Sequence, residues 1–159
     1  MSKFIKIMLI VFLSLILIGV GGYFWTEYRG NSLSNRAQEK GIKIVGQKHN
    51  QSSNKTFYKL YYPNQTIDMS ALKETIFYVY KQNEKVDGFV FEIYDTETSA
   101  LEAAQLDGNE NINREDLLKL AQVQKNHLIA SFDTVSWSIG SPRDTAIDQK
   151  RISLFELYF

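Results

Sequence analysis

The sequence predicts an N-terminal transmembrane helix followed by a single α+β domain, and three features of the chain support this prediction. The stretch from Ile7 to Tyr23 is uncharged and strongly apolar. After Asp68, apolar residues recur at spacings of three and four, the period of a helix with one buried side. In the segment from Phe89 to Tyr94, successive residues fall on opposite sides, with Phe89, Phe91 and Ile93 on one of them, as in a strand.

We expect the domain to be a small mixed or antiparallel sheet, covered on one face by two or three helices and loosely ferredoxin-like. The chain has 159 residues. About 130 of them follow the apolar stretch, enough for one hydrophobic core and few for two. The predicted division is an anchor at residues 1–28, a juxtamembrane linker at 29–40 and an extracytoplasmic domain at 41–159.

The anchor is predicted from length and charge. Between Phe4 and Trp25 the only charged residue is Lys6, and this segment spans about 33 Å as a helix, close to the roughly 30 Å of a bilayer's hydrocarbon core. Lys3 and Lys6 precede the apolar run, so the positive-inside tendency places the N-terminus in the cytoplasm and the domain outside. Aromatic rings prefer the membrane boundary, which suits Tyr23, Trp25 and Tyr28.

Two other interpretations of the apolar segment stay open at this point. A secretory signal that is cleaved also begins with a charge and an apolar core, but bulky Tyr23, Phe24 and Trp25 occupy the place where a cleavage site needs small residues. The third interpretation is a helix buried in the core of a soluble domain. We expect an uncleaved, single-pass anchor.

After the anchor, the segment from Glu27 to Asn35 is polar, as linkers are. One helical turn is expected over Arg36 to Lys40, with Gly41 ending it. The first two strands are predicted at Gly41 to Val45 and Thr56 to Tyr62, separated by a polar turn at His49 to Lys55.

The main helix is predicted from an N-cap at Asp68 to about Asn83, with one apolar stripe formed by Met69, Leu72, Ile76, Val79 and Tyr80. The alternative is a strand over Thr75 to Tyr80, because these residues have high strand propensity and a turn at 82–88 would let them pair with Phe89 to Tyr94.

The second half of the domain is expected to add helices and then strands. Asp95 or Thr96 caps a short helix that includes Leu101 and Ala104, and a loop follows from Leu106 to Asn113. Asn113 then caps a second helix, with acidic residues in its first turn.

A long strand at His127 to Ile139, a breaker-rich loop at Gly140 to Lys150 and a final strand at Arg151 to Phe159 complete the predicted order β-β-α-β-α-α-β-β.

Several kinds of chemistry find no support in the residues. The chain has no cysteine, which excludes disulfides, thiol catalysis, thiolate metal sites and a lipid-attachment cysteine. His49 and His127 lack metal-ligand partners at useful spacing, and neither a nucleophile elbow nor a glycine-rich phosphate loop is present. No catalytic, cofactor-binding or metal-binding residue is therefore assigned, and no cofactor is expected.

Glu92 and Asp95 are the carboxylates of most interest. A buried Glu92 would be an acid of raised pKa, but the favoured interpretation is a residue on the solvent side of a one-sided sheet. The aromatic residues Tyr61, Tyr62, Trp137, Tyr158 and Phe159 form either core or a partner surface, and core is favoured.

The predicted function is a membrane-anchored, non-catalytic interaction or accessory domain outside the cytoplasm. Frequent Lys, Asn, Ile, Tyr and Phe fit a bacterial coding sequence rich in A and T. The expected partners are the lipid bilayer, through residues 4–25, and another envelope protein; the formal charge is zero, which gives no general attraction for nucleic acid. The alternatives are an immunity protein that blocks a toxin at the membrane and a small envelope hydrolase that uses Glu92, Asp95 and Asp133.

Overall fold

The computed structural model describes residues 3–83, 88–108, 112–134 and 138–140. These residues form four helices and five strands, and the predicted α+β class is confirmed. In chain order the elements are α1 (Lys3–Glu39), β1 (Lys43–Asn50), β2 (Lys55–Tyr61), α2 (Met69–Gln82), β3 (Gly88–Tyr94), α3 (Glu97–Gly108), α4 (Arg114–His127), β4 (Leu128–Asp133) and β5 (Ser138–Gly140). The predicted loop after Gly140 and the predicted strand at 151–159 lie outside the described residues.

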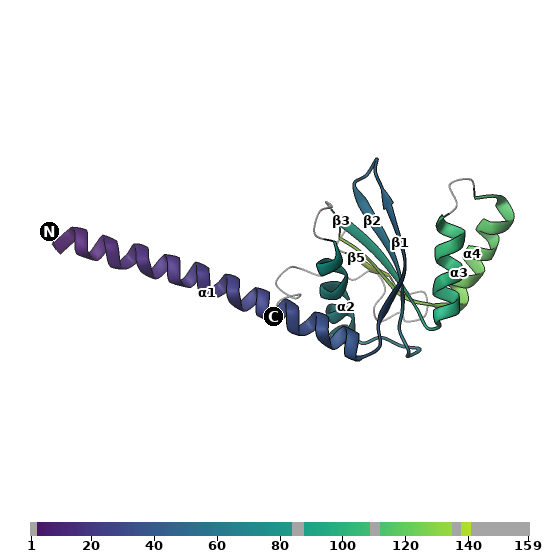
Figure 1. Cartoon of the computed structure of the whole chain (residues 1–159), viewed down its shortest axis with the longest axis horizontal. Coiled ribbons are helices and arrows are strands. Elements are labelled where there is room, and N and C mark those ends of the chain that lie inside the picture. Colours follow the sequence, from purple (N-terminus) through teal and green to yellow (C-terminus); the bar gives the residue numbers. More distant parts are fainter. Residues whose placement is uncertain (1–2, 84–87, 109–111, 135–137, 141–159) are drawn as a thin grey trace.

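Helix α1 projects from the domain as a single rod, and only its C-terminal end reaches the other elements (Figure 1). Its apolar side chains between Ile5 and Tyr28 are exposed. The helix is long and apolar enough to cross a membrane, with a mean hydropathy of 2.5 in a stretch that is not buried at all. This exposure excludes the interpretation of the segment as a core helix.

The predicted linker at 29–40 is helical as far as Glu39. The helical turn expected from Arg36 is confirmed, and the linker expected over Glu27 to Asn35 from its polar composition is wrong. Leu33 and Ala37 lie one turn apart and are buried among the core residues between α1 and α2. Packing of this small apolar stripe outweighs the polar residues around it. Gly41, with φ of +81°, ends the helix as predicted. Its N–H donates to Gln38 O at 2.9 Å, and that of Ile42 donates to Ala37 O at 3.1 Å, which is a Schellman motif.

The sheet has the sequential strand order β1-β2-β3-β4-β5. Only β2 and β3 are parallel, because α2 connects them, and the other neighbours are antiparallel. Since β2 and β3 pair directly, the described strands do not form the split βαβ unit of a ferredoxin-like domain. β1 is longer than predicted and includes His49, which pairs with Thr56 of β2.

The long strand predicted over 127–139 is instead divided into β4 and β5, which pair with each other. The division follows Asp133, where the backbone of Thr134 donates to Phe89 O at 3.1 Å and its hydroxyl accepts from Phe89 N at 2.9 Å. These bonds connect the end of β4 to the start of β3, and β4 does not extend beyond Asp133.

Helices cover both faces of the sheet, not one as predicted (Figure 1). Phe89, Phe91 and Ile93 pack toward α2 and the end of α1. Tyr94 packs on the opposite face with Ala100 of α3 and Val123 of α4. The alternation predicted for β3 is therefore present, but helices cover both of its sides, because the connection from β3 to β4 folds back as a helix pair.

The three shorter helices begin at caps expected from the sequence. The backbone N–H of Ala71 donates to Asp68 Oδ1 and that of Ser99 to Thr96 Oγ1 at 3.1 Å, while that of Asp116 donates to Asn113 Oδ1 at 2.9 Å. The alternative strand at 75–80 is excluded, since these residues belong to α2. Helix α3 continues to Gly108, into the segment predicted as loop.

Candidate functional site

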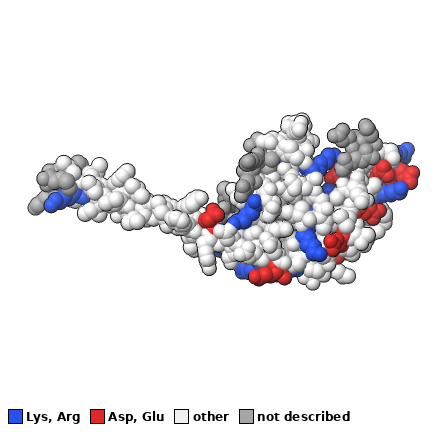
Figure 2. Space-filling model, in the orientation of Figure 1, with Lys and Arg blue, Asp and Glu red and all other residues white. Residues whose placement is uncertain are grey.

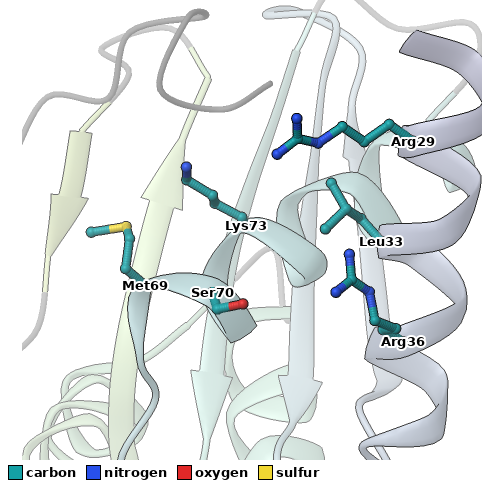
Figure 3. Close-up of a pocket in the computed structure, with 6 residues that line it drawn as sticks. All are labelled: Arg29, Leu33, Arg36, Met69, Ser70 and Lys73. Carbon is teal, nitrogen blue, oxygen red and sulfur yellow. The ribbon is translucent and has the colours of Figure 1, made fainter. Parts of the chain in front are cut away.

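A pocket of about 290 Å³ lies between the end of α1 and the start of α2 (Figure 3). Three of its six lining residues are basic, and no acidic side chain lines it. The lining residues are Arg29, Leu33 and Arg36 from α1 and Met69, Ser70 and Lys73 from α2. We call this cavity the junction pocket.

Helix geometry explains why these residues meet. Arg29, Leu33 and Arg36 are spaced by four and three residues, so they share one side of α1. Leu33 is buried between α1 and α2, and Gly30 lets α2 approach α1 closely. A β-carbon on Gly30 would lie 3.3 Å from Phe77 Cδ1, tighter than ordinary van der Waals contact. The close approach of the two helices therefore forms the pocket.

The charges around the pocket are unevenly balanced. Glu74 of α2 has a side chain that is only 2% exposed, and it is held by Lys40, with Nζ to Oε2 2.6 Å, and by Arg36, with Nε to Oε1 3.8 Å. Arg29 lies over the ring of Trp25, 5.2 Å from its centroid. Among the residues that the structure describes, no carboxylate pairs with Arg29 or Lys73. The pocket is therefore positively charged.

The second polar feature is a cluster between the sheet and the helices α3 and α4. Lys59 Nζ lies 2.8 Å from Glu92 Oε2 and 2.8 Å from Asp107 Oδ2. Tyr94 donates its hydroxyl to Glu92 Oε2, and Gln124 Nε2 donates to Glu92 Oε1 at 3.2 Å. We call these five residues the Lys59 cluster.

The Lys59 cluster corrects the interpretation of Glu92 as a solvent-facing residue. Its side chain is 19% exposed and that of Lys59 is 7% exposed, because α3 and α4 cover this face of the sheet. Sequence reasoning missed this covering, since a single charge in a strand ordinarily marks a wet face. In this protein it marks a buried ion pair.

Electrostatics stabilise the charged and hydrogen-bonded state of the Lys59 cluster. Burial alone would lower the pKa of Lys59, but the adjacent carboxylates of Glu92 and Asp107 outweigh it and raise that pKa above 10.5. Burial, together with the negative charge of Glu92, also strongly raises the pKa of the Tyr94 hydroxyl. Tyr94 therefore stays a hydrogen-bond donor, and Lys59 stays a cation.

A smaller pocket of about 180 Å³ lies beside this cluster, lined by Gln47, Lys48, Phe57, Lys59, Ala104 and Asp107. Its charged groups already have partners. Lys48 Nζ donates to the backbone oxygen of Asp107 at 2.9 Å, and the Asp107 carboxylate pairs with Lys59. These contacts account for the polar groups as parts of the fold.

The three carboxylates considered for a hydrolase do not line either of these pockets. Asp95 Oδ1 lies 2.9 Å from His127 Nδ1, at the end of β3. Asp133 pairs in register with Val90 of β3. Glu92 is held by Lys59. The three carboxylates thus have different neighbours and do not share one pocket.

The two histidines lie in different parts of the fold and have different partners. His49 Nδ1 is 3.2 Å from Thr56 Oγ1 across the β1–β2 hairpin, whereas His127 contacts Asp95. Within the described ranges, no group of three His, Asp or Glu residues is arranged to hold a metal ion.

The aromatic pair Tyr61 and Tyr62 belongs to the cores, as favoured from the sequence. Tyr62 is buried with the residues around α2, and Tyr61 packs against the core beneath α3 and α4. Trp137, Tyr158 and Phe159 lie outside the described residues.

Sequence reasoning missed the junction pocket altogether. Its one signal was the helical spacing of Arg29 and Arg36, which is visible only if residues 29–40 are recognised as a helix. Lys73 joins them through the packing of α1 on α2. Comparison with known proteins adds no further constraint, because no family model, no curated protein and no solved structure matches the chain.

Proposed function

We propose that this chain is a single-pass membrane protein whose domain lies outside the cytoplasm and acts as a non-catalytic interaction or accessory unit for another envelope protein. The observation that best supports this proposal is the continuity of α1. One helix runs from turns whose apolar side chains are exposed into turns that pack on α2. A bilayer would cover the first part, and the domain covers the second.

The proposed orientation rests on charge. Lys3 and Lys6 precede the apolar segment, and basic residues flanking a membrane span are enriched on the cytoplasmic side. Arg29 and the other charged residues of the domain follow the segment. The proposed location is therefore a bacterial cell membrane, with the domain on its outer side.

A rigid junction suits an accessory role. Leu33 and Ala37 bury the last turns of α1 against the domain, and Lys40 adds an ion pair to the buried Glu74. A flexible linker would let the domain sample many heights above the bilayer. A continuous helix instead holds the domain at one height and one tilt relative to the membrane span, which favours contact with a neighbouring membrane protein.

The settings of the carboxylates support a binding role over the hydrolase alternative. Glu92 is engaged by a buried lysine and Asp95 by His127. A general acid or base must reach a substrate proton directly or through one water. Both side chains are directed to partners within the fold.

The orientation is tested by cysteine labelling, for which the natural chain is an ideal background because it has no cysteine. Asn126→Cys places a thiol on the exposed surface of α4, and Ser2→Cys places one before the span. A membrane-impermeant maleimide is expected to label Asn126→Cys in intact cells, and Ser2→Cys only after permeabilisation. The reverse pattern contradicts the proposal, as does a mature chain that has lost the N-terminal segment.

The interaction role is tested by affinity capture of the full chain from detergent-solubilised membranes. The matched control is a tagged peptide of residues 1–40, which shares the span and lacks the domain. A membrane protein enriched only with the full chain supports the proposal. An incoming toxin captured instead supports the immunity alternative, and turnover of a substrate by the purified chain contradicts a non-catalytic role.

A further inference from the structure

We infer that the junction pocket binds the phosphate of an anionic phospholipid headgroup, in the leaflet from which α1 leaves the membrane. This inference rests on the proposed function only in requiring that α1 spans a bilayer. Its evidence is the set of cations in the pocket, their lack of acidic partners among the described residues, and their height along α1.

The height follows from helical geometry. Trp25 ends the apolar segment, and Arg29 lies four residues further along, about 6 Å up the helix axis. The headgroup layer on each side of a bilayer is about 5–8 Å thick. With Trp25 at the edge of the hydrocarbon core, Arg29 therefore lies at the depth of the lipid phosphates.

A second cation of the pocket reaches the same level along α1. Lys73 extends from α2 toward the level of Arg29, on the side of the pocket nearest the apolar part of α1 (Figure 3). Arg36 lies at the opposite end of the pocket and is already 3.8 Å from Glu74. Arg29 and Lys73 are thus the primary phosphate ligands, and Arg36 contributes a longer-range positive charge.

The chemistry of these groups matches a phosphodiester. A guanidinium presents paired N–H donors to phosphate oxygens, and an ammonium supplies a compact point charge. Beneath them, Leu33 and Met69 give the pocket apolar walls. A lipid headgroup can enter from the membrane side, because the apolar turns of α1 that precede Arg29 are exposed and would lie beside the acyl chains.

The charge pattern of the domain surface agrees with a local site and not a general basic face. Blue and red residues are mixed over the view of the domain in Figure 2. The whole chain has equal numbers of basic and acidic residues, 18 of each. Anionic lipid would therefore be attracted at the junction pocket specifically, which makes the inference testable with two residues.

The experiment uses the full chain purified in a non-ionic detergent. Native mass spectrometry measures the retention of added phosphatidylglycerol, of phosphatidylcholine and of inorganic phosphate. The natural chain is expected to retain one phosphatidylglycerol in preference to phosphatidylcholine. Each basic residue near an anionic headgroup contributes about fivefold to affinity, so Arg29→Gln with Lys73→Gln is expected to weaken binding by about 25-fold.

A matched control removes the same charges elsewhere. Arg114→Gln with Lys125→Gln also loses one arginine and one lysine, from exposed positions on α4 across the sheet from α1. This variant is expected to bind phosphatidylglycerol as the natural chain does. The exchange Arg29→Lys with Lys73→Arg retains both charges and is expected to keep the lipid preference, which separates loss of charge from damage to the fold.

Three results would overturn the inference. The first is that the natural chain and the variant with Arg29→Gln and Lys73→Gln retain lipid equally. The second is that the natural chain retains phosphatidylglycerol and phosphatidylcholine equally. The third is that inorganic phosphate at the same concentration displaces the lipid, which would indicate a site for soluble anions. All three double variants keep the apolar part of α1, so they are expected to stay in the membrane. A reversed labelling pattern would contradict the proposed orientation and leave the lipid site standing, whereas equal lipid retention would overturn the lipid site and leave the orientation standing.

Discussion

Lys59 Nζ lies 2.8 Å from Glu92 Oε2 on adjacent parallel strands, beneath the helix pair α3 and α4. The two residues are paired in register, so their side chains leave the sheet on the same face. The pair therefore joins the sheet to its helical cover by electrostatics as well as by apolar packing.

Replacing Lys59 is expected to destabilise the domain strongly. Lys59→Met leaves Glu92, which is only 19% exposed, without its cation. Loss of one partner of a buried pair costs about 3–5 kcal/mol, and the partial exposure of Glu92 places the expected loss at the lower end, about 3 kcal/mol. Denaturant unfolding of the detergent-solubilised chain, monitored by circular dichroism, measures the change in the free energy of unfolding. The control is Lys43→Met, whose pair with Glu97 is exposed at 58% and 48% and is worth about 1 kcal/mol or less. Equal losses in the two variants would contradict a buried pair.

A second replacement is expected to restore part of that stability. Glu92→Gln removes the unpaired charge and keeps an acceptor for the Tyr94 hydroxyl. In the background of Lys59→Met it should recover about 1–3 kcal/mol, the usual coupling between residues in one network. A double-mutant cycle measures the coupling energy. Additive losses would show that Lys59 and Glu92 do not act as a unit.

Stability is expected to fall in alkaline solution. Folding raises the pKa of both Lys59 and Tyr94, so it favours their protonated forms. The contribution is fully present below the ordinary values of 10.5 and 10.0, and is lost as the pH rises above them toward the folded-state values. Denaturation midpoints between about pH 8 and about pH 11 measure the decline. Tyr94→Phe should show a shallower decline, and an unchanged slope would exclude Tyr94 as a source.

Gly46 is expected to resist substitution because helix α3 lies directly over it. A β-carbon there would overlap Ala104 Cβ. Gly46→Ala should cost about 1–3 kcal/mol, as overpacking does. Ala104→Gly removes the overlapping atom, although it costs about 1 kcal/mol in helix propensity. The double variant should therefore lose less stability than the sum of the two single losses. Strict additivity of the unfolding free energies would refute the steric explanation.

The continuity of α1 is expected to hold the domain rigidly on the span. Spin labels at Tyr23→Cys and Tyr80→Cys, both exposed, report the distance between the span and α2. Pulsed electron resonance should give a narrow distribution for this pair, and Asn31→Pro should shift or broaden it by interrupting the helix. Asn31→Ala in the same labelled chain is the control. A distribution already broad without the proline would indicate a flexible junction.

Local patterns predicted much of the fold. The caps at Asp68 and Asn113, the stop at Gly41 and the alternation in β3 depend on neighbours within a few residues, and the sequence contains those neighbours directly. The strand alternative at 75–80 failed because the apolar stripe of α2 has a buried surface to pack against.

The junction pocket and the Lys59 cluster were not predictable in the same way. Arg29 and Lys73 come from helices far apart in the chain, and Lys59, Glu92 and Asp107 from two strands and a helix. Composition described 29–40 as a linker because most of its residues are polar. Two apolar residues one turn apart, Leu33 and Ala37, were enough to make it part of the core.

The sequence by itself determined the apolar N-terminal segment, its flanking lysines, the helix caps and the α+β class, because each depends on residue type and short spacing. Only the tertiary structure decided that helices cover both faces of the sheet, that Glu92 is paired and largely covered, and that α1 continues into the domain. Those features depend on which surfaces meet after the chain has folded, and the free energy of burying them outweighs local preference.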